Sequence, residues 1–505
     1  VLQGFLFLAA VGFTGTIYLK WPQVKSWWIT KDFTADDDTL EKLVKIKEKN
    51  SLAQIPTIPE TELDPEVPGL YYWGGIDSNS KNNKPGVVFP RRVTSFDNMY
   101  LREVCLAVVD GKEVNLAVDE KGNLLKWNRK TCKVLLPDQN LVSVKESNGY
   151  AYALNKRGEI LVIPLNDNKD MAKYVSLKRS WILPWKKHTL YHWKLNTGKC
   201  FHSRGEKKVI QFDTGKTHLV MISNVGKVYT CSTGSQPSPD AKSYGQFGVP
   251  GMSRFDEFPV CNELHEIELL NNGLSNLNTV YRRNIQQVAC GDYHTLARDS
   301  TGKLFVFGSN TYGQLGFPIS YDTEQLAFPK RLTRFQSYFK RDCITKCKDI
   351  YCSGETSYVV MESSPLDVQH SDNLPFSNNV TYFSFGNGLF GELGNGRYMN
   401  SQPDPTPIRI INNDSGSCLV DQWSCGHNHV ICKLHSGEVL AWGVNDNGQL
   451  GSGKRLKQCK PQYLPDLLQP GTKKSSTEIF SSRLHLNAQQ ALATGPFSSC
   501  IYWKK

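Results

Sequence analysis

Short segments in which apolar and polar residues alternate recur in pairs from residue 70 to the end of the chain. His294–Ala297 and Leu304–Phe307 form the clearest pair, and a turn centred on Gly302 separates them. A period of two residues is typical of strands, and a glycine turn between two such segments indicates a hairpin. This part of the chain is therefore predicted to be built from β-hairpins.

The clearest hairpin occurs twice, because the stretch 288–316 returns at 424–451. The first copy carries Cys290, Gly291, His294, Gly302, Gly308, Asn310, Gly313, Gln314, Leu315 and Gly316 where the second carries Cys425, Gly426, His429, Gly437, Gly443, Asn445, Gly448, Gln449, Leu450 and Gly451. Such self-similarity indicates an internal repeat. Glycines at fixed offsets fit a backbone that needs positive φ or a close approach to a neighbour.

The repeated motif, G-x-x-H followed by V/L-x-x-[WF]-G-x-N-x-x-G-Q-L-G, resembles the regulator of chromosome condensation repeat. The resemblance implies an all-β, seven-bladed β-propeller, a fold that hosts several unrelated functions. Residues that recur at one motif position are expected to have a structural role. They are His218, His294, His429, Gly308, Gly443, Gln314 and Gln449.

Seven hairpins are predicted, with paired segments 114–118 and 124–127, 150–154 and 160–163, 217–221 and 227–231, 294–297 and 304–307, 357–361 and 382–386, 429–432 and 439–442, and 490–493 and 500–503. The segment Leu70–Trp73 resembles a second strand that lacks a first. Either this segment or Ile501–Trp503 supplies the final strand of the closing blade. Closure of the ring removes an exposed sheet edge.

A stretch without charge opens the chain. Residues 1–19 are mostly apolar and long enough to span a bilayer as one helix. Aromatic and basic residues typical of a membrane interface follow directly, namely Lys20, Trp21, Lys25, Trp27 and Trp28. We predict a single transmembrane helix within an anchor of residues 1–28. A remnant of a targeting signal and a buried core helix are the alternatives.

Residues 29–69 are predicted to be a tether. Acidic residues gather at the start of 34–50 and lysines at its end, which is the polarity that a helix dipole favours. Four prolines between residues 54 and 69 then favour a stiff, extended linker. The propeller is predicted to occupy residues 70–505.

The net charge of +11 favours an anionic partner, although basic chains are also common in mitochondria. The 14 cysteines show neither a disulfide framework nor the paired spacing of a zinc module. Several occupy strand positions, where a thiol behaves as a small apolar group, so we predict a reducing compartment. Glycosylation triplets at Asn379 and Asn413 keep a lumenal location open.

Known catalytic motifs do not occur in the sequence. Asp213–Thr217 resembles a phosphate loop, but Ile210 stands where that loop requires glycine. Nucleophile elbows and dinucleotide motifs are also missing from the sequence. His427 and His429 lack a third metal ligand. We expect no enzymatic activity, no cofactor and no metal.

The insertion 178–194 combines tryptophans with basic residues. Its candidate partner-docking residues are Trp181, Trp185, Tyr191, Trp193, Lys186 and Lys187. Such side chains suit a protein hot spot or an anionic lipid surface. A third interpretation makes the insertion the outer strands of blade three, with the tryptophans covering the sheet.

The membrane segment, the proline-rich tether and the degenerate first hairpins resemble the fungal mitochondrial inner-membrane members of the repeat family. That resemblance implies a matrix-facing, non-enzymatic scaffold for respiratory chain biogenesis. Its expected partners are subunits or assembly factors of the cytochrome bc1 complex (complex III), or the mitochondrial ribosome, and direct DNA binding is not expected. The alternative is a guanine nucleotide exchange factor for a small GTPase, as in the founding member of the family.

Overall fold

The computed structural model describes residues 55–76, 85–166, 171–179, 185, 187–237, 241–365, 379–412, 416–417, 419–471 and 476–505. Residues Thr57–Lys505 form one compact unit. Among the described residues, no helix is long and apolar enough to cross a membrane. The predicted span at 1–19 and tether helix at 34–50 lie outside the described residues, as do Lys20, Trp21, Lys25, Trp27 and Trp28.

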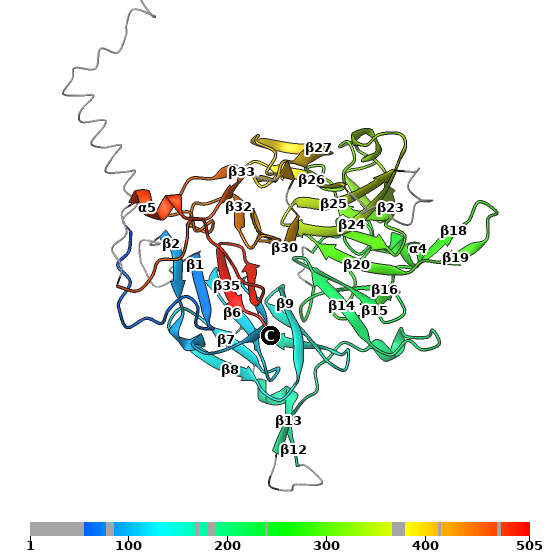
Figure 1. Cartoon of the computed structure of the whole chain (residues 1–505). Coiled ribbons are helices and arrows are strands. Elements are labelled where there is room, and N and C mark those ends of the chain that lie inside the picture. The colour runs from blue at the N-terminus through cyan, green and yellow to red at the C-terminus, as the bar shows by residue number, and fades with distance from the viewer. Residues whose placement is uncertain are drawn as a thin grey trace, which may run out of the picture. The chain divides into compact units, whose positions relative to one another are not determined.

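Seven antiparallel sheets of three or four strands stand in a ring in the described part of this unit (Figure 1). We call them blades one to seven and count the strands of each blade outward from the centre. The arrangement confirms the predicted all-β, seven-bladed propeller. Six of the seven predicted hairpins form the second and third strands of blades one to six.

The first two blades contain hairpins that depart from the motif, and blade three follows them in the chain. Blade one is β3 (Leu101–Cys105), β6 (Asn115–Asp119), β7 (Leu124–Trp127) and β8 (Cys132–Leu136). Blade two is β9 (Leu141–Ser147), β10 (Tyr150–Asn155) and β11 (Ile160–Pro164). Blade three is β14 (Val209–Thr214), β15 (His218–Ser223), β16 (Val228–Ser232) and β17 (His265–Glu266).

Blades four and six contain the two clearest repeats, and blade five lies between them. Blade four is β20 (Ile285–Cys290), β21 (His294–Asp299), β22 (Leu304–Ser309) and β23 (Gln325–Leu332). Blade five is β24 (Cys343–Ser353), β25 (Thr356–Pro365), β26 (Asn379–Gly388) and β27 (Met399–Ile408). Blade six is β30 (Val420–Cys425), β31 (His429–Leu434), β32 (Val439–Gly443) and β33 (Gln458–Tyr463).

Blade seven joins the two ends of the propeller. It consists of β34 (Gln490–Thr494), β35 (Ser498–Trp503), β1 (Leu70–Ile76) and β2 (Pro85–Arg92). Gly74 of β1 pairs with Ser498 of β35 in the way that Gly308 pairs with His294. The N-terminal strand β1 is therefore the third strand of the closing blade, and β35 takes the place of a His-bearing second strand. The seventh predicted hairpin thus forms the first and second strands of this blade, and neither of the two candidate segments is its final strand, which is β2.

Blade two lacks a long fourth strand in the described residues, and the end of the insertion covers its edge instead. Leu161 of β11 bridges Lys194, and Val162 N donates to Trp193 O at 3.0 Å. The interpretation that the insertion forms the outer strands of blade three is wrong, because these hydrogen bonds are made to blade two. The rest of the insertion forms a separate hairpin, β12 (Val175–Arg179) and β13 (Lys187–Tyr191), which projects from the ring (Figure 1).

Apolar side chains fill the spaces between neighbouring blades. Strands β15, β31 and β32 are buried at every position, since a neighbouring blade covers each face of the sheet. Trp73 of β1 packs with Ile431 and Ala441 between blades seven and six. Burial of apolar surface, at roughly 25 cal/mol per Å², is thus the main force that holds blade to blade.

Short elements occupy the connections. The small strands are β4 (Val108–Val109), β5 (Lys112–Glu113), β18 (Asn272–Leu274), β19 (Val280–Arg282), β28 (Ile411–Asn412) and β29 (Gly416–Ser417). The helices are α4 (Glu268–Asn271) and α5 (Ser476–Ser481), with 3-10 turns at Thr94–Phe96, Met171–Tyr174, Thr197–Lys199, Pro250–Met252 and Gln336–Tyr338. β18 and β19 form a second hairpin that projects from the ring (Figure 1).

Candidate functional site

The recurring histidines connect neighbouring blades. Each imidazole Nε2 shares a hydrogen bond with a hydroxyl of the following blade, in the pairs His218 with Thr295 at 3.0 Å, His294 with Ser357 at 2.9 Å and His429 with Ser499 at 2.8 Å. All three rings are fully buried. Burial lowers the pKa of His218 and of His429 to about 3 and that of His294 to about 4, so the rings are neutral at pH 7.

The glycine three residues before each histidine makes room for the ring. A Cβ on Gly291 would overlap the imidazole of His294, and the same holds for Gly215 with His218 and for Gly426 with His429. The G-x-x-H spacing therefore has a steric cause. It keeps the imidazole pressed against the backbone and directed at the next blade.

The glutamines of the Gly-Gln-Leu-Gly loops organise the other side of the same contact. The side-chain Oε1 of Gln314 accepts a hydrogen bond from Tyr312 N at 2.8 Å, and the backbone carbonyl of Gln314 accepts one from Ser357 Oγ at 2.7 Å. Gln449 does the same with Asn447 N at 2.9 Å and Ser499 Oγ at 2.8 Å. One hydroxyl thus contacts both the histidine and the glutamine loop of the preceding blade.

The glycines that end the third strands are required by backbone geometry. Gly308 has a φ of 108° and Gly443 a φ of 109°, both in the region that favours glycine. A Cβ at Gly443 would also lie 2.7 Å from the Cα of His429. Each glycine lets the third strand approach the backbone at the histidine.

Blade five carries an acid where the other loops carry glutamine. Glu392 is fully buried, and its Oε2 accepts a hydrogen bond from Phe390 N at 2.7 Å. Its Oε1 has no hydrogen-bond partner among the described residues. Burial raises the pKa of Glu392 to about 7. This loop therefore holds a carboxyl group that titrates near neutral pH.

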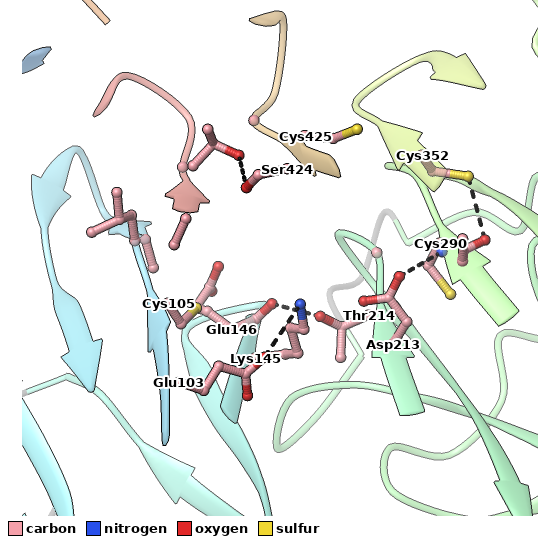
Figure 2. A pocket seen from close by; sticks show the side chains of 18 of the residues that line it. Glu103, Cys105, Lys145, Glu146, Asp213, Thr214, Cys290, Cys352, Ser424 and Cys425 are labelled. Atoms are coloured by element: carbon pink, nitrogen blue, oxygen red, sulfur yellow. Dashed lines mark hydrogen bonds and ion pairs between the residues drawn. The ribbon is translucent and has the colours of Figure 1, made fainter. Parts of the chain in front are cut away.

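The inner strands enclose a central channel with a cavity volume of about 1470 Å³. Six blades place a polar or thiol side chain at one register position, which is Glu146, Thr214, Cys290, Cys352, Cys425 and Thr494. Figure 2 shows several of them around the channel. Burial raises the pKa of Cys290, Cys352 and Cys425, so these thiols stay protonated. In the part of the chain that the structure describes, no three His, Cys, Asp or Glu side chains are grouped to hold a metal.

Charged residues of blades one to three meet on one side of this channel (Figure 2). Lys145 Nζ lies 3.9 Å from Glu103 Oε1, and Asp213 Oδ2 accepts a hydrogen bond from Cys290 N at 2.8 Å. Burial opposes the charge on Lys145, but Glu103 and Asp213 outweigh it and raise the pKa of this amine. Burial also raises the pKa of the neighbouring Glu146 to about 7. The channel wall thus carries a compensated ion pair beside a titratable acid.

A second ionic group crosses three blades at one mouth of the channel. Asp292 lies 2.6 Å from Lys216 Nζ and 3.4 Å from His427 Nδ1. A Cβ on Gly354 would collide with the His427 ring, so this glycine lets His427 reach across blade five. Burial by itself would raise the pKa of Asp292, but His427 and Lys216 lower it to about 2. Asp292 is therefore ionised at neutral pH.

This ionic group was not predicted from the sequence, although its members share one position in the repeat. Lys216, Asp292, Gly354 and His427 each stand two residues before the histidine position of their own blade. Each of the first three donates its backbone N–H to the carbonyl of the next, at 3.0, 2.7 and 2.9 Å. An alignment of the blades at the histidine places these four residues together. The position of His427 is one of the variable positions in the G-x-x-H motif, so the motif alone does not single it out.

The predicted docking residues of the insertion divide into two groups. Tyr191 is buried and donates its hydroxyl to Val162 O at 2.8 Å, and Trp193 is half-buried and stacks on Tyr174 with ring centres 4.6 Å apart. Trp185 is 79% exposed, and Lys187 is exposed at the start of β13. Trp181 and Lys186 lie outside the described residues. Among the described members, Trp185 and Lys187 are available to a partner.

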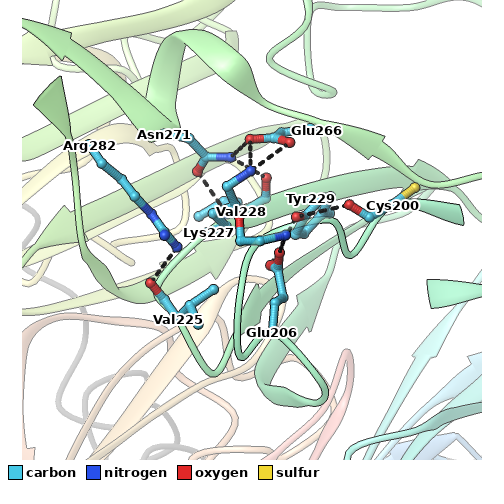
Figure 3. A network of polar contacts seen from close by, with 10 residues as sticks. Cys200, Glu206, Val225, Lys227, Val228, Tyr229, Glu266, Asn271 and Arg282 are labelled. Atoms are coloured by element: carbon cyan, nitrogen blue, oxygen red, sulfur yellow. Dashed lines mark hydrogen bonds and ion pairs between the residues drawn. The ribbon is translucent and has the colours of Figure 1, made fainter. Parts of the chain in front are cut away.

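The second hairpin, β18 and β19, is the more apolar of the two. Leu274, Leu277 and Val280 are 69%, 86% and 70% exposed. A polar network fixes its base to blade three (Figure 3), in which Asn271 Oδ1 accepts from Val228 N at 2.8 Å and an Arg282 guanidinium donates to Val225 O at 2.8 Å. The hairpin is thus a fixed projection of the rim.

Seven blades in a closed ring, histidine–hydroxyl bonds from blade to blade and Gly-Gln-Leu-Gly loops define the class of this protein as a repeat propeller. Models of the regulator of chromosome condensation (RCC1) repeat match residues 285–314, and also 301–360 and 436–479. The matches fall on blades four to six. Blades four and six carry both the histidine and the glutamine of the motif, whereas blade five has Thr356 and Glu392 at these positions.

The chain is similar over almost its whole length to protein FMP25, mitochondrial, of Saccharomyces cerevisiae. The two are 44% identical over 518 residues, which cover 99% of this chain and 85% of that protein. The chain belongs to the RCC1-repeat family that contains this yeast protein. Because the relative is mitochondrial, the comparison supports a mitochondrial location.

Two solved structures share the fold. Human WBSCR16 is 15% identical with a TM-score of 0.54, covering 88% of this chain and 100% of that one. Prp20p of Saccharomyces cerevisiae is 16% identical with a TM-score of 0.53, covering 88% of this chain and 93% of that one. At such low identities the likeness concerns the fold alone.

Proposed function

We propose that this chain is a non-enzymatic scaffold of mitochondrial respiratory chain biogenesis. In this proposal residues 1–28 anchor it in the inner membrane, and the propeller faces the matrix. It holds a subunit or assembly factor of complex III, or a component of membrane-associated mitochondrial translation. The close similarity to a mitochondrial relative supports the compartment.

The observation that carries the scaffold proposal is the β12–β13 hairpin. Trp185 is 79% exposed, and an exposed tryptophan next to cations is typical of a protein hot spot. Lys178, Arg179 and Lys187 are exposed on the two strands beside it. A closed ring is a rigid base for such a projection, so little ordering free energy is lost when a partner binds.

The test is affinity capture of the full chain after mild detergent extraction, followed by quantitative mass spectrometry. We expect complex III subunits, their assembly factors or mitochondrial ribosomal proteins, and a loss of at least tenfold with Trp185→Ala combined with Lys187→Ala. Phe255→Ala is the matched control, because Phe255 is 80% exposed on a different loop. Equal capture of partners by the unchanged chain, the double variant and the Phe255→Ala control would contradict the docking role of the hairpin.

The membrane anchor is tested separately by carbonate extraction of mitochondria. An anchored chain stays in the pellet, whereas release into the supernatant contradicts the anchor. Protease treatment of intact mitochondria, and of mitochondria with an osmotically ruptured outer membrane, then reports the orientation. A matrix-facing propeller is cut in neither sample unless detergent is added.

The second candidate is a guanine nucleotide exchange factor. Prp20p, which shares the fold, binds Gsp1p and histones. An exchange factor releases labelled nucleotide from its GTPase at catalytic concentrations. If capture recovers a single small GTPase that is held most tightly without nucleotide, the exchange function replaces the scaffold function.

A further inference from the structure

Two loops of neighbouring blades place exposed cations beside exposed apolar side chains. The loop after β32 presents four consecutive exposed residues with the sequence Lys-Arg-Leu-Lys, and its Leu456 is 62% exposed. The loop after β26 presents Leu389 and Tyr398, which are 45% and 48% exposed. We call this set the basic rim surface, and its members are Leu389, Tyr398, Lys454, Arg455, Leu456 and Lys457.

Contacts across the two blades hold this surface in place. Tyr398 Oη donates to Lys457 O at 3.1 Å, and Lys457 Nζ lies 5.1 Å from the centre of the Tyr398 ring. Gly396 N donates to Cys459 O at 2.7 Å between the same loops. The exposed side chains therefore stand on a backbone that is already ordered, which lowers the entropic cost of binding.

The charge of this region is of one sign. Segments 388–398 and 452–460 contain Arg397, Lys454, Arg455, Lys457 and Lys460. Their acid is Glu392, which is buried beneath the surface. Within the described residues, none of the five cations pairs with a carboxylate. Five uncompensated cations together attract an anionic partner.

The surface extends toward the place where the chain enters the propeller. Lys454 Nζ lies 5.4 Å from the ring of Phe480 in α5, and Phe480 is 40% exposed. Gly471 N, in the segment leading to α5, donates to Ile58 O at 3.1 Å. Figure 1 shows α5 beside the start of the described propeller chain. The exposed cations and the entry point of the chain thus share one rim.

We propose that the basic rim surface rests on an anionic membrane, with its cations at the lipid phosphates and Leu456 in the boundary between head groups and acyl chains. The proposal rests on the proposed function, in which the segment before the propeller anchors the chain in a bilayer. A cationic loop with an exposed leucine and tyrosine suits an anionic lipid surface. Nucleic acid would also attract the cations, so cross-links to RNA are one of the outcomes that the test distinguishes.

The test places the photo-crosslinking residue p-benzoylphenylalanine at position 456 of the full chain. The protein is reconstituted into vesicles of phosphatidylcholine with or without phosphatidylglycerol and irradiated, and the adducts are identified by mass spectrometry. We expect lipid adducts in the anionic vesicles and at least tenfold fewer in the neutral ones. The control carries p-benzoylphenylalanine at position 277 in place of Leu277, which is 86% exposed between β18 and β19, and it should give few lipid adducts.

Charge variants separate the cations from the general fold. The combination Lys454→Gln, Arg455→Gln and Lys457→Gln should lower the yield of lipid adducts at least tenfold, since each cation near an anionic surface contributes about a fivefold change in binding. Lys454→Arg with Lys457→Arg keeps the charge and should keep the yield. An unchanged thermal midpoint in both variants shows that the fold is intact.

Three results would overturn the proposal. They are equal lipid adducts at positions 456 and 277, a yield that ignores the three charge changes, and adducts to RNA or protein alone when irradiation is carried out in isolated mitochondria. Failure of the proposed anchor is distinguishable from these results. A chain that carbonate releases from the membrane still forms charge-dependent lipid adducts at position 456 if the surface itself is correct.

Discussion

The contact between blades four and five differs from the contact between blades one and two. At one register position the first contact holds His294 against the hydroxyl of Ser357 in the next blade. At the equivalent position the second contact has Val114 in blade one and Ala151 in blade two, and both belong to one apolar cluster. Either a polar pair or an apolar pair thus closes the space between blades. The repeat motif includes the histidine of the polar pair but has no residue that marks the apolar pair.

The largest effect is expected where the motif fixes the backbone. Gly443→Ala should lower the free energy of unfolding by about 4 kcal/mol, because positive φ and a blocked Cβ position add their costs. Gly111→Ala in blade one has a φ of 74° but open space around the new Cβ, and it should cost about 1 kcal/mol. Chemical denaturation of both variants in the same detergent measures the difference. Equal costs would show that sterics at the histidine contact do not matter.

The acid in the loop of blade five provides the next largest effect, and it depends on pH. Between its ordinary pKa of 4.5 and its folded pKa of about 7, the unfolded chain releases the proton of Glu392 while the folded chain keeps it. Stability therefore falls as the pH rises through this window. Glu392→Gln should remove that loss and raise the free energy of unfolding above pH 7 by on the order of 3 kcal/mol.

Gln314→Glu is the matched reverse change in blade four, because Gln314 is also buried in the same loop position. It should introduce the pH dependence that Glu392→Gln removes. Thermal midpoints measured across the pH range report both. If the two variants show the same pH profile as the unchanged protein, the buried carboxyl group does not titrate as described.

Removing the polar pair tests its value directly. His294→Leu should cost about 2 kcal/mol, because it takes away the hydrogen bond to Ser357 and leaves an imperfectly filled space. Adding Ser357→Ala should cost less than the sum of the single changes, with a coupling of about 1 kcal/mol. A double-mutant cycle by denaturation measures the coupling. Strict additivity would mean that the two side chains are merely neighbours.

The smallest effect is a gain in stability. Asn115 of blade one is fully buried, and neither atom of its amide has a hydrogen-bond partner among the described residues. Asn115 occupies the register position of Thr295, the residue that bonds a histidine of the preceding blade. The preceding blade here is blade seven, which has Ser498 at the histidine position. Asn115→Val should raise the free energy of unfolding by about 1 kcal/mol. A lower thermal midpoint would show that the amide is satisfied by water.

Much of the ring was predictable from residue patterns, because pairs such as 294–297 and 304–307 carry both strands and the turn between them. The cover of blade two was not predictable, since Trp193 and Lys194 complete that sheet by backbone hydrogen bonds that leave no periodic pattern. The Lys216–Asp292–His427 group was missed for a related reason. Its members come from three blades, and only closure of the ring brings them within reach of one another.

The pairing of β1 with β35 has a consequence for how the protein is made. The third strand of the closing blade, β1, leaves the ribosome well before its partner, residues Ser498–Trp503, because the two are separated by almost the whole propeller. Until then β1 presents an open edge, and contacts of such long sequence separation form slowly. A polypeptide that stops before Gln490 lacks β34 and β35, so it cannot complete blade seven and close the ring. A truncated product therefore keeps an exposed sheet edge, which is prone to pair with other chains.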